Sequence, residues 1–258
     1  MQEIDKFTQV AYLNAAAVRG DSRVIETEEL AYVITPSSLE RWYNAVSRCL
    51  LPPDRFDEIN QLIEQFGDSN FNWHLWPDSS PQLLDFLVHK LRFQEIGTAS
   101  FLTKTLKVEL KSYIPRNQIV PLSDSTFDSY LQAKMHAWNN SADQISEIEK
   151  AALYSMNNPK HSTFVLLENR RVLAAVSSYS DSNCAYLRGD FVVPEHRGRG
   201  LYKELIQFRE TELIKSQIHT LAVIADEETS APIYKKMNYS FKGKIRVLAK
   251  KHSRWVSL

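Results

Sequence analysis

Hydrophobic and polar positions follow a regular order in the second half of the chain. Strands are predicted by short apolar runs at 119–122, 163–167, 172–178, 184–193, 220–225 and 240–250. Helical spacing of apolar residues predicts helices that begin near Ser123, Ser141, Gly200 and Ser230. The resulting order is β-α-α-β-β-β-α-β-α-β, with one strand–helix–strand crossover. This order predicts an α/β or α+β fold with a mixed sheet.

The first half of the chain gives a more helical pattern. A capping box at Ser37–Glu40 is followed by Trp42, Val46 and Leu50 at helical spacing, which predicts a helix there. Apolar stripes predict two more helices, at 59–66 and 80–91. Strands are expected at 71–76 and 98–106.

A faint internal repeat relates the two halves. Lys90-Leu-Arg-Phe93 ends a predicted helix much as Lys236-Met-Asn-Tyr239 does, and each helix lies between two apolar strands. We place the boundary near Pro115–Gln118, which gives two domains at residues 1–116 and 117–258.

The composition is that of an ordinary globular protein. Of the 258 residues 43% are hydrophobic, and 31 basic and 31 acidic residues give a net charge near zero. This balance argues against a nucleic-acid partner bound through bulk charge. No apolar run approaches the roughly 20 residues of a membrane span, and residues 1–20 do not have the pattern of a signal peptide.

Cysteine and histidine give no sign of a disulfide framework or a metal centre. Cys49 and Cys184 are the two cysteines, and the seven histidines form no HxxxH pair. We therefore expect a cytoplasmic protein that binds no metal.

The strongest candidate for chemistry is the segment 192–203, where a strand leads through a glycine-containing turn into a helix. The whole chain has seven glycines, so the pair Gly198 and Gly200 indicates a backbone requirement. The first N–H groups of such a helix lack intrahelical partners and, with the helix dipole, favour an anion such as a pyrophosphate. Arg197 and Arg199 would add positive charge beside it.

Two common phosphate motifs are absent from this segment. A P-loop needs Gly-Lys-Ser/Thr, which the sequence lacks, and a dinucleotide fingerprint needs a third glycine where Lys203 stands. The alternative to an anion site is an ordinary surface turn with two solvated arginines.

The segment resembles motif A of the GNAT acetyltransferase superfamily, which carries Arg/Gln-x-x-Gly-x-Gly/Ala after a V-x-P strand end. Arg197 and Gly200 match this pattern, whereas Tyr202 replaces the final small residue and would crowd the pyrophosphate loop. The resemblance implies an acyl-CoA cofactor, usually acetyl-CoA, and a mixed central sheet flanked by helices.

A second resemblance lies downstream, at residues 230–239. The family's motif B usually ends Tyr-x-x-x-Gly-Phe; here Tyr234 and Tyr239 match, and Asn238 replaces the glycine. Both motifs occur at the separation and in the strand order of the family fold.

The resemblance also implies roles for single residues. Pantetheine would run along the backbone of Asp190, Phe191 and Val192. The pyrophosphate would be held by Gly198, Arg199, Gly200, Leu201, Tyr202 and Lys203.

Catalysis by this family implies an acid and a base. Tyr234 would protonate the leaving thiolate, the alternative being a core tyrosine. Some members take a base from a glutamate twelve residues before this tyrosine, but here that residue is Ala222. Asp190 interrupts an apolar strand end and is the best substitute; the alternatives are a salt bridge with Arg188 or simple exposure.

The first half resembles the degenerate first domain of tandem GNAT proteins. It lacks the Arg-x-x-Gly-x-Gly turn, and Val88 stands where Tyr234 stands in the repeat. We expect residues 1–116 to be non-catalytic and residues 117–258 to acetylate a primary amine of a small molecule or peptide. The alternative is a non-enzymatic acyl-CoA sensor or assembly module, which Ala222 and Tyr202 would favour. The sequence leaves the acceptor and the oligomeric state open.

Overall fold

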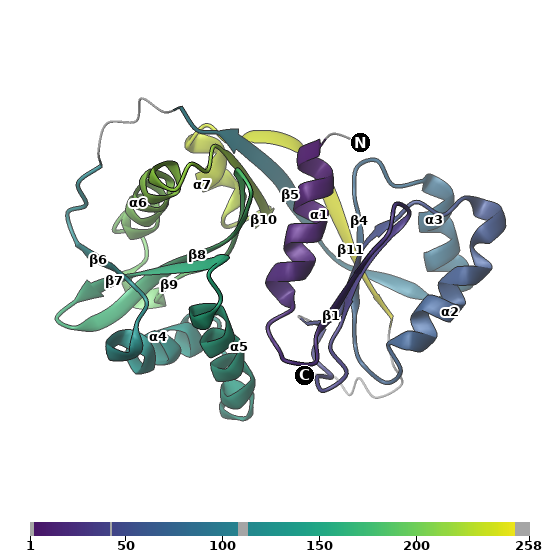
Figure 1. Cartoon of the computed structure of the whole chain (residues 1–258), viewed down its shortest axis with the longest axis horizontal. Helices are drawn as coiled ribbons and strands as arrows, with labels where there is room; N and C mark the ends of the chain where they lie inside the picture. Colours follow the sequence, from purple (N-terminus) through teal and green to yellow (C-terminus); the bar gives the residue numbers. More distant parts are fainter. Residues whose placement is uncertain (1–2, 42, 108–112, 251–258) are drawn as a thin grey trace. The chain divides into compact units, whose positions relative to one another are not determined.

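The computed structural model of the protein describes residues 3–41, 43–107 and 113–250. Contacts divide the chain into two compact units (Figure 1): unit 1 holds residues 1–102 and 224–258, and unit 2 holds residues 103–223. The C-terminal segment thus belongs to the same unit as the N-terminal half. The functional boundary expected at 116/117 is a different kind of division and stays a prediction. Among the described helices, none has both the length and the apolar character needed to cross a membrane.

Unit 1 combines most of the first half of the chain with the last helix and strand. Its elements are α1 (Glu3–Ala16), β1 (Arg23–Glu26), β2 (Leu30–Ile34), β3 (Ala45–Cys49), η1 (Pro53–Arg55), α2 (Asp57–Gln65), β4 (Asn72–Leu75), α3 (Pro81–Asp85), the π-helical segment η2 (Phe86–Lys90), β5 (Phe93–Thr105), α7 (Ala231–Lys236) and β11 (Ser240–Lys250). The strand order is β1-β2-β3-β4-β11. β3 and β4 are parallel, and the other neighbours in this order are antiparallel.

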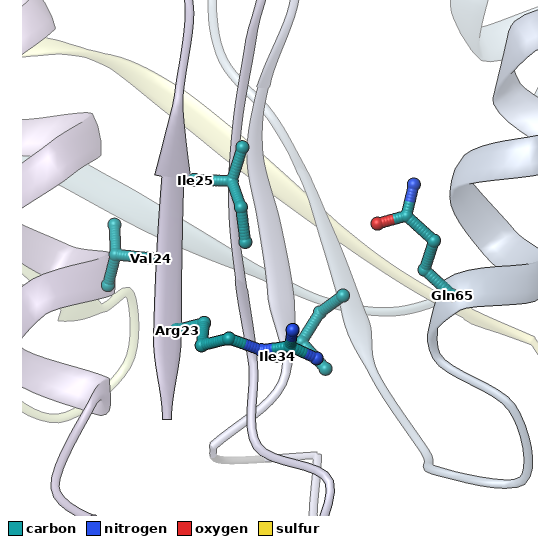
Figure 2. Close-up of a pocket in the computed structure, with 5 residues that line it drawn as sticks. All are labelled: Arg23, Val24, Ile25, Ile34 and Gln65. Atoms are coloured by element: carbon teal, nitrogen blue, oxygen red, sulfur yellow. The ribbon is translucent and has the colours of Figure 1, made fainter. Parts of the chain in front are cut away.

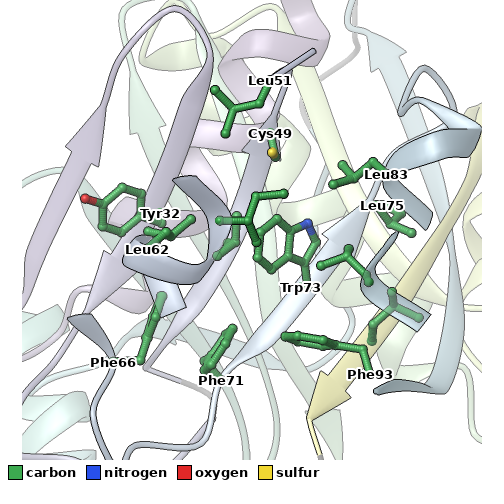
Figure 3. Close-up of a cluster of buried hydrophobic side chains, with 14 of the residues drawn as sticks. Tyr32, Cys49, Leu51, Leu62, Phe66, Phe71, Trp73, Leu75, Leu83 and Phe93 are labelled. Atoms are coloured by element: carbon green, nitrogen blue, oxygen red, sulfur yellow. The ribbon is translucent and has the colours of Figure 1, made fainter. Parts of the chain in front are cut away.

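The core of unit 1 lies between its strands and the helices α2 and α3 (Figure 3). Trp73 of β4 is fully buried, and its ring meets the edge of Phe93 at 5.9 Å. Phe66 and Phe71 stack at 4.1 Å beside them. Leu248 of β11 belongs to the same cluster, so the last strand and the first half of the chain share one core.

One predicted helix of the first half is wrong. The segment after the Ser37–Glu40 capping box contains the fully buried strand β3, not a helix. Residues four positions apart lie on the same face in a helix and also in a strand. The spacing of Val46 and Leu50 therefore did not distinguish a helix from a strand. The Ser38 hydroxyl accepts from the Glu40 N–H, and the Asn44 amide donates to the carbonyls of both residues, which holds a loop there. Trp42 lies outside the described residues.

Other elements of the first half agree with their patterns. The predicted helices at 59–66 and 80–91 correspond to α2 and to α3 with η2, and the predicted strands correspond to β4 and β5. The pattern did not predict α1, β1 and β2.

Unit 2 contains the elements between β5 and α7. They are β6 (Gln118–Pro121), α4 (Asp124–Ala137), η3 (Ala142–Gln144), α5 (Ile145–Asn157), β7 (His161–Glu168), β8 (Arg171–Asp181), β9 (Cys184–Val192), η4 (Pro194–His196), α6 (Leu201–Lys215) and β10 (Thr220–Asp226), with the ends of β5 and β10 crossing the division between the units. The strand order is β10-β9-β8-β7-β6. β9 and β10 are parallel, and the other pairs are antiparallel.

Helices cover both faces of the strands in unit 2 (Figure 1). α4 and α5 pack on one face through Phe127, Tyr130 and Ile148, which meet Phe191 of β9 or its neighbours. α6 packs on the other face through Leu201 and Leu205. The mixed α/β architecture predicted from the sequence is therefore confirmed.

The helix starts predicted near Ser123 and Ser141 are confirmed. Capping boxes form at Ser123 and at Ser141. The hairpin between β7 and β8 turns at Asn169 and Arg170, whose φ angles of 52° and 63° are those of a two-residue hairpin turn.

The two segments of the internal repeat end their helices in the same backbone conformation. Arg92 follows η2 with a φ of 62°, and Asn238 follows α7 with a φ of 65°. Phe93 and Tyr239 come next, and both are buried. Asparagine is the residue other than glycine that tolerates the left-handed region best, which explains how Asn238 replaces the glycine of motif B.

We expect Asn238→Ala to lower the free energy of unfolding by about 1 kcal/mol. Alanine is strained in the left-handed conformation and lacks the polar side chain that makes asparagine tolerant of it. Asn238→Gly should be at least as stable as the parent protein. Denaturant titration of the three proteins measures the difference. Equal stability of the alanine and glycine variants would show that the φ angle at this position carries no cost.

Candidate active site

The turn between β9 and α6 has the backbone conformation that its glycines predict. Gly198 and Gly200 have φ angles of 77° and 82°, in the left-handed region where a side chain is strained. No atom lies within 4 Å of the position that a Cβ would take at either residue. The turn therefore presents open backbone that another molecule can approach closely.

The first turn of α6 is suited to an anion. Gly200 precedes the helix without a side-chain cap, and the first N–H groups of a helix lack intrahelical partners. Leu201 is buried in the core, and Lys203 is exposed. Within the described residues Lys203 forms no ion pair, so its ammonium group is available to a bound phosphate.

Arg197 has a structural task in this turn. Its Nε donates to the Val192 carbonyl at 3.1 Å and its Nη2 to the Ala137 carbonyl at 3.3 Å. The guanidinium thus ties the end of β9 to the end of α4, and its charge stays beside the turn.

Arg199 is held by two neighbours of the turn. Its Nη2 donates to Glu168 Oε1 and its Nη1 lies against His196 Nδ1, both at 2.6 Å. A guanidinium can only donate, so His196 Nδ1 is the acceptor and carries no proton. The hydrogen bond from Arg199 lowers the pKa of the Glu168 carboxyl.

Each unit contains a pocket among its described residues. In unit 2 a pocket of about 420 Å³ is lined by Glu168, Asn169, Arg171, Leu173 and His196, beside the Arg199 contacts. In unit 1 a pocket of about 610 Å³ is lined by Arg23, Val24, Ile25, Ile34 and Gln65. Figure 2 shows Gln65 facing the strands β1 and β2 from α2. These residues belong to no motif, and no pattern in the sequence indicates the pocket of unit 1.

Asp190 is a buried carboxylate with several donors. Oδ1 accepts from the Ser177 N–H at 3.1 Å and from Arg209 Nη1 at 2.8 Å, and Oδ2 accepts from the Tyr202 hydroxyl at 3.1 Å. The side chains of Asp190 and Arg209 are 7% and 0% exposed, so this is a buried ion pair. Of the alternatives considered for Asp190, a salt bridge is what forms, with Arg209 in place of Arg188.

A bulge in β9 decides where Asp190 points. The register with β8 shifts between Ala175 and Ser177, and Gly189 has a φ of 67°. Asp190 therefore faces α6, whereas Phe191 packs on the opposite face against Tyr130 and Trp138.

Tyr202 does not crowd the turn. Its ring packs against the core on the α6 side, and its hydroxyl is turned to Asp190. The bulky residue at the last position of motif A thus leaves the Gly198–Gly200 backbone open.

Three charged residues of α6 were missed in the sequence. The first is Arg209. The second is Glu204, whose carboxylate accepts from the N–H groups of Arg116 and Asn117. The third is Glu210, which forms an ion pair with Lys104 at 2.7 Å. A signal was available: Arg209 interrupts the i, i+4 series of leucines on this helix.

The remaining predicted positions lie as follows. The Val192 carbonyl already accepts from Arg197, and the Phe191 side chain is buried in the core. Ala222 is fully buried on β10 in register with Tyr186. Tyr234 belongs to unit 1, is 1% exposed and meets the ring of Tyr239 edge-on at 4.8 Å.

Comparison with known proteins agrees with this geometry. The family model described as an acetyltransferase (GNAT) domain matches residues 128–256, half of the chain. Curated protein sequences give no match.

Solved structures share the fold over nearly the whole chain. A GCN5-related N-acetyltransferase from Kribbella flavida has a TM-score of 0.68 at 11% identity, covering 99% of this chain and 98% of its own. A conserved protein of unknown function from Staphylococcus epidermidis also has a TM-score of 0.68, at 16% identity. The match covers 90% of this chain and 95% of that protein. A tandem GNAT protein from the clavulanic acid biosynthesis pathway has a TM-score of 0.57 at 10% identity, with 95% of both chains covered.

The match of the family model over half the chain, together with the open glycine turn between β9 and α6, identifies the protein as a member of the GNAT acetyltransferase family.

Proposed function

We propose that the protein transfers an acetyl group from acetyl-CoA to a primary amine by direct attack in a ternary complex. The observation that carries this proposal is the turn at Gly198 and Gly200, whose open backbone leads into the uncapped start of α6. In a member of the GNAT family this turn fits the pyrophosphate of coenzyme A.

The residues that would hold the cofactor are those of the turn and the first turn of α6. The N–H groups of 198–203 would bind phosphate oxygens, with the Lys203 ammonium and the Arg199 guanidinium beside them. Arg197 keeps the turn in place, and the β9 backbone at 190–192 would line the pantetheine. When bound, acetyl-CoA supplies the acetyl thioester.

Proton transfer would be shared by an acid and a base. The amine attacks only as the neutral form, so a proton must leave it, and the departing thiolate gains one. We propose Tyr234 as the acid. Asp190 stays our prediction for the base, although its oxygens already accept hydrogen bonds from Ser177, Arg209 and Tyr202.

We further propose that residues 117–258 supply the catalytic groups and that residues 1–116 are a non-catalytic GNAT-like domain. The protein would act in the cytoplasm. Release of free coenzyme A in the presence of primary amines tests the activity; binding of acetyl-CoA without turnover over a wide amine panel would point to a sensor.

The turn can be tested by Gly200→Asp. Aspartate would add strain at a φ of 82° and a negative charge where phosphate donors point. We expect the dissociation constant of coenzyme A to rise at least tenfold, about 1.4 kcal/mol. Gly20→Asp makes the same change at an exposed position in unit 1 and serves as the control. Unchanged affinity in folded Gly200→Asp protein, measured by calorimetry, would place the cofactor elsewhere.

Tyr234→Phe removes one hydroxyl and little volume. We expect kcat to fall roughly 10- to 100-fold, less than for many general acids because a coenzyme A thiolate is already a fair leaving group. Calorimetric affinity for coenzyme A should be unchanged. Full turnover with only reduced stability would make Tyr234 a core tyrosine.

Asp190→Asn tests whether Asp190 acts as the base or serves to stabilise the fold through its ion pair with Arg209. Because the mutation leaves Arg209 buried without its carboxylate, we expect a loss of about 3 kcal/mol in the free energy of unfolding. Glu168→Gln removes an exposed ion pair and should hardly change stability. If Asp190→Asn were as stable as the parent and kcat fell by about 100-fold, the aspartate would act as the base.

A further inference from the structure

Arg188 is a cation that the fold leaves without an acidic partner. It is partly buried on β9, and within the described residues its guanidinium takes part in no hydrogen bond or ion pair. Arginine offers five donors in a fixed fork, so a partly buried guanidinium with none of them used is suited to a ligand.

The bulge in β9 is the reason that Arg188 has no acid beside it. Arg188 is in register with Ser177, on the face that α4 and α5 cover, while Gly189 turns the next residue, Asp190, to α6 and Arg209. The two neighbouring charges of β9 therefore lie on opposite faces, and they cannot pair.

His161 supplies a second polar group near Arg188. Its Nε2 is buried without a hydrogen-bond partner, and its ring meets Tyr179 edge-on at 5.3 Å. Burial and the positive charge of Arg188 lower the pKa of His161 to about 4. The imidazole is therefore neutral at neutral pH, and one of its nitrogens carries a proton that it can donate.

Strand register places these groups together on one face. His161 is paired with Tyr179, Tyr179 with Tyr186, and Tyr186 with Ala222 of β10. Residues directly opposite on neighbouring strands have their side chains on the same face. The four residues thus form one row across β7, β8, β9 and β10.

Arg188 belongs to the next row, which also contains Ser177 and Thr163. It is the first residue of β9 beyond the register with β10, which covers 184–187. This is where the β9 backbone at 190–192, proposed to line the pantetheine, begins. A group bound by Arg188 would therefore lie near the end of the cofactor that carries the acetyl group.

One acidic residue near this face already has a partner. Asp181 at the end of β8 pairs with Lys160 at 3.0 Å, and this pair lies beside Tyr179. The carboxylate of Asp181 is therefore bound to a cation other than Arg188.

We propose that Arg188 and His161 bind an anionic group of the acceptor, so that the substrate is a primary amine that also carries a carboxylate or a phosphate. The inference rests on the proposed acetyl transfer and adds its substrate class. The guanidinium would supply a paired set of donors to two anion oxygens, and the imidazole N–H one more. Binding would thereby satisfy two polar groups for which the described residues supply no hydrogen-bond partner.

The test compares matched primary amines that differ in one group. Glycine, β-alanine and phosphoethanolamine carry an anion; glycinamide, β-alaninamide and ethanolamine are their neutral counterparts. We expect kcat/KM to be at least tenfold higher for the anionic member of a pair. In Arg188→Gln the KM of the anionic amines should rise at least tenfold with little change in kcat, and the preference over the neutral amines should disappear.

Three further variants separate binding from structure. Arg188→Lys keeps the charge and should recover part of the affinity for anionic amines. His161→Phe keeps the ring contact with Tyr179 and should raise the same KM several-fold. Arg170→Gln removes a positive charge at the exposed tip of the β7–β8 hairpin and should change neither constant.

The outcomes distinguish this inference from the proposed function. Turnover that favours neutral amines, or an equal loss for both classes in Arg188→Gln, overturns the anionic substrate class and leaves acetyl transfer standing. A weaker affinity of Arg188→Gln for coenzyme A, with amine constants unchanged, assigns Arg188 to the cofactor phosphates and also overturns it. Coenzyme A binding without turnover of any amine, anionic ones included, contradicts both proposals.

Discussion

The buried ion pair between Asp190 and Arg209 is the interaction on which the arrangement of unit 2 depends. Arg209 is fully buried on α6, and besides the carboxylate it binds the Ser177 carbonyl, so it joins α6 to both β8 and β9. Two charges in an apolar interior are stable only when they are paired and hydrogen-bonded. The bond from Tyr202 to the same carboxylate fixes the first turn of α6 and with it the open turn before the helix. The backbone that we propose to bind the cofactor phosphates is thereby positioned by the contacts of Tyr202 and Arg209.

The bulge at Gly189 determines that Asp190 pairs with Arg209 and not with Arg188. In an unbroken strand the side chains of residues 188 and 190 would lie on one face and could neutralise each other. The extra residue sends Asp190 to the α6 face and keeps Arg188 on the α4–α5 face. Asp190 pairs with Arg209 of α6, whereas Arg188 forms no ion pair within the described residues. A local change in strand register thus places two neighbouring charges of β9 in different surroundings.

The sequence predicted the features that are determined by neighbouring residues, and it did not predict those that depend on contacts between distant residues. The left-handed conformation of Gly198 and Gly200 and the helix starts near Ser123 and Ser141 are set by neighbouring residues, and their patterns predicted them. The helix expected after Ser37 failed because a four-residue spacing fits two periods, and tertiary burial made β3 a strand. The partners of Asp190 and Arg199 come from residues 19 and 31 positions away, respectively, and no motif records such pairs.

The two segments of the internal repeat share a backbone conformation but differ in the side chain at the position of Tyr234. Arg92 adopts nearly the same left-handed conformation as Asn238, although arginine has no local interaction that favours it. Each is followed by a buried aromatic residue at the start of a strand. At the position equivalent to Tyr234, however, Val88 packs against the core of unit 1. The backbone path is therefore the same in both segments even at a cost in strain, since it sets the entry of a strand into a core. The side chain at the position of Tyr234 differs, and the half with valine there also has no glycine turn.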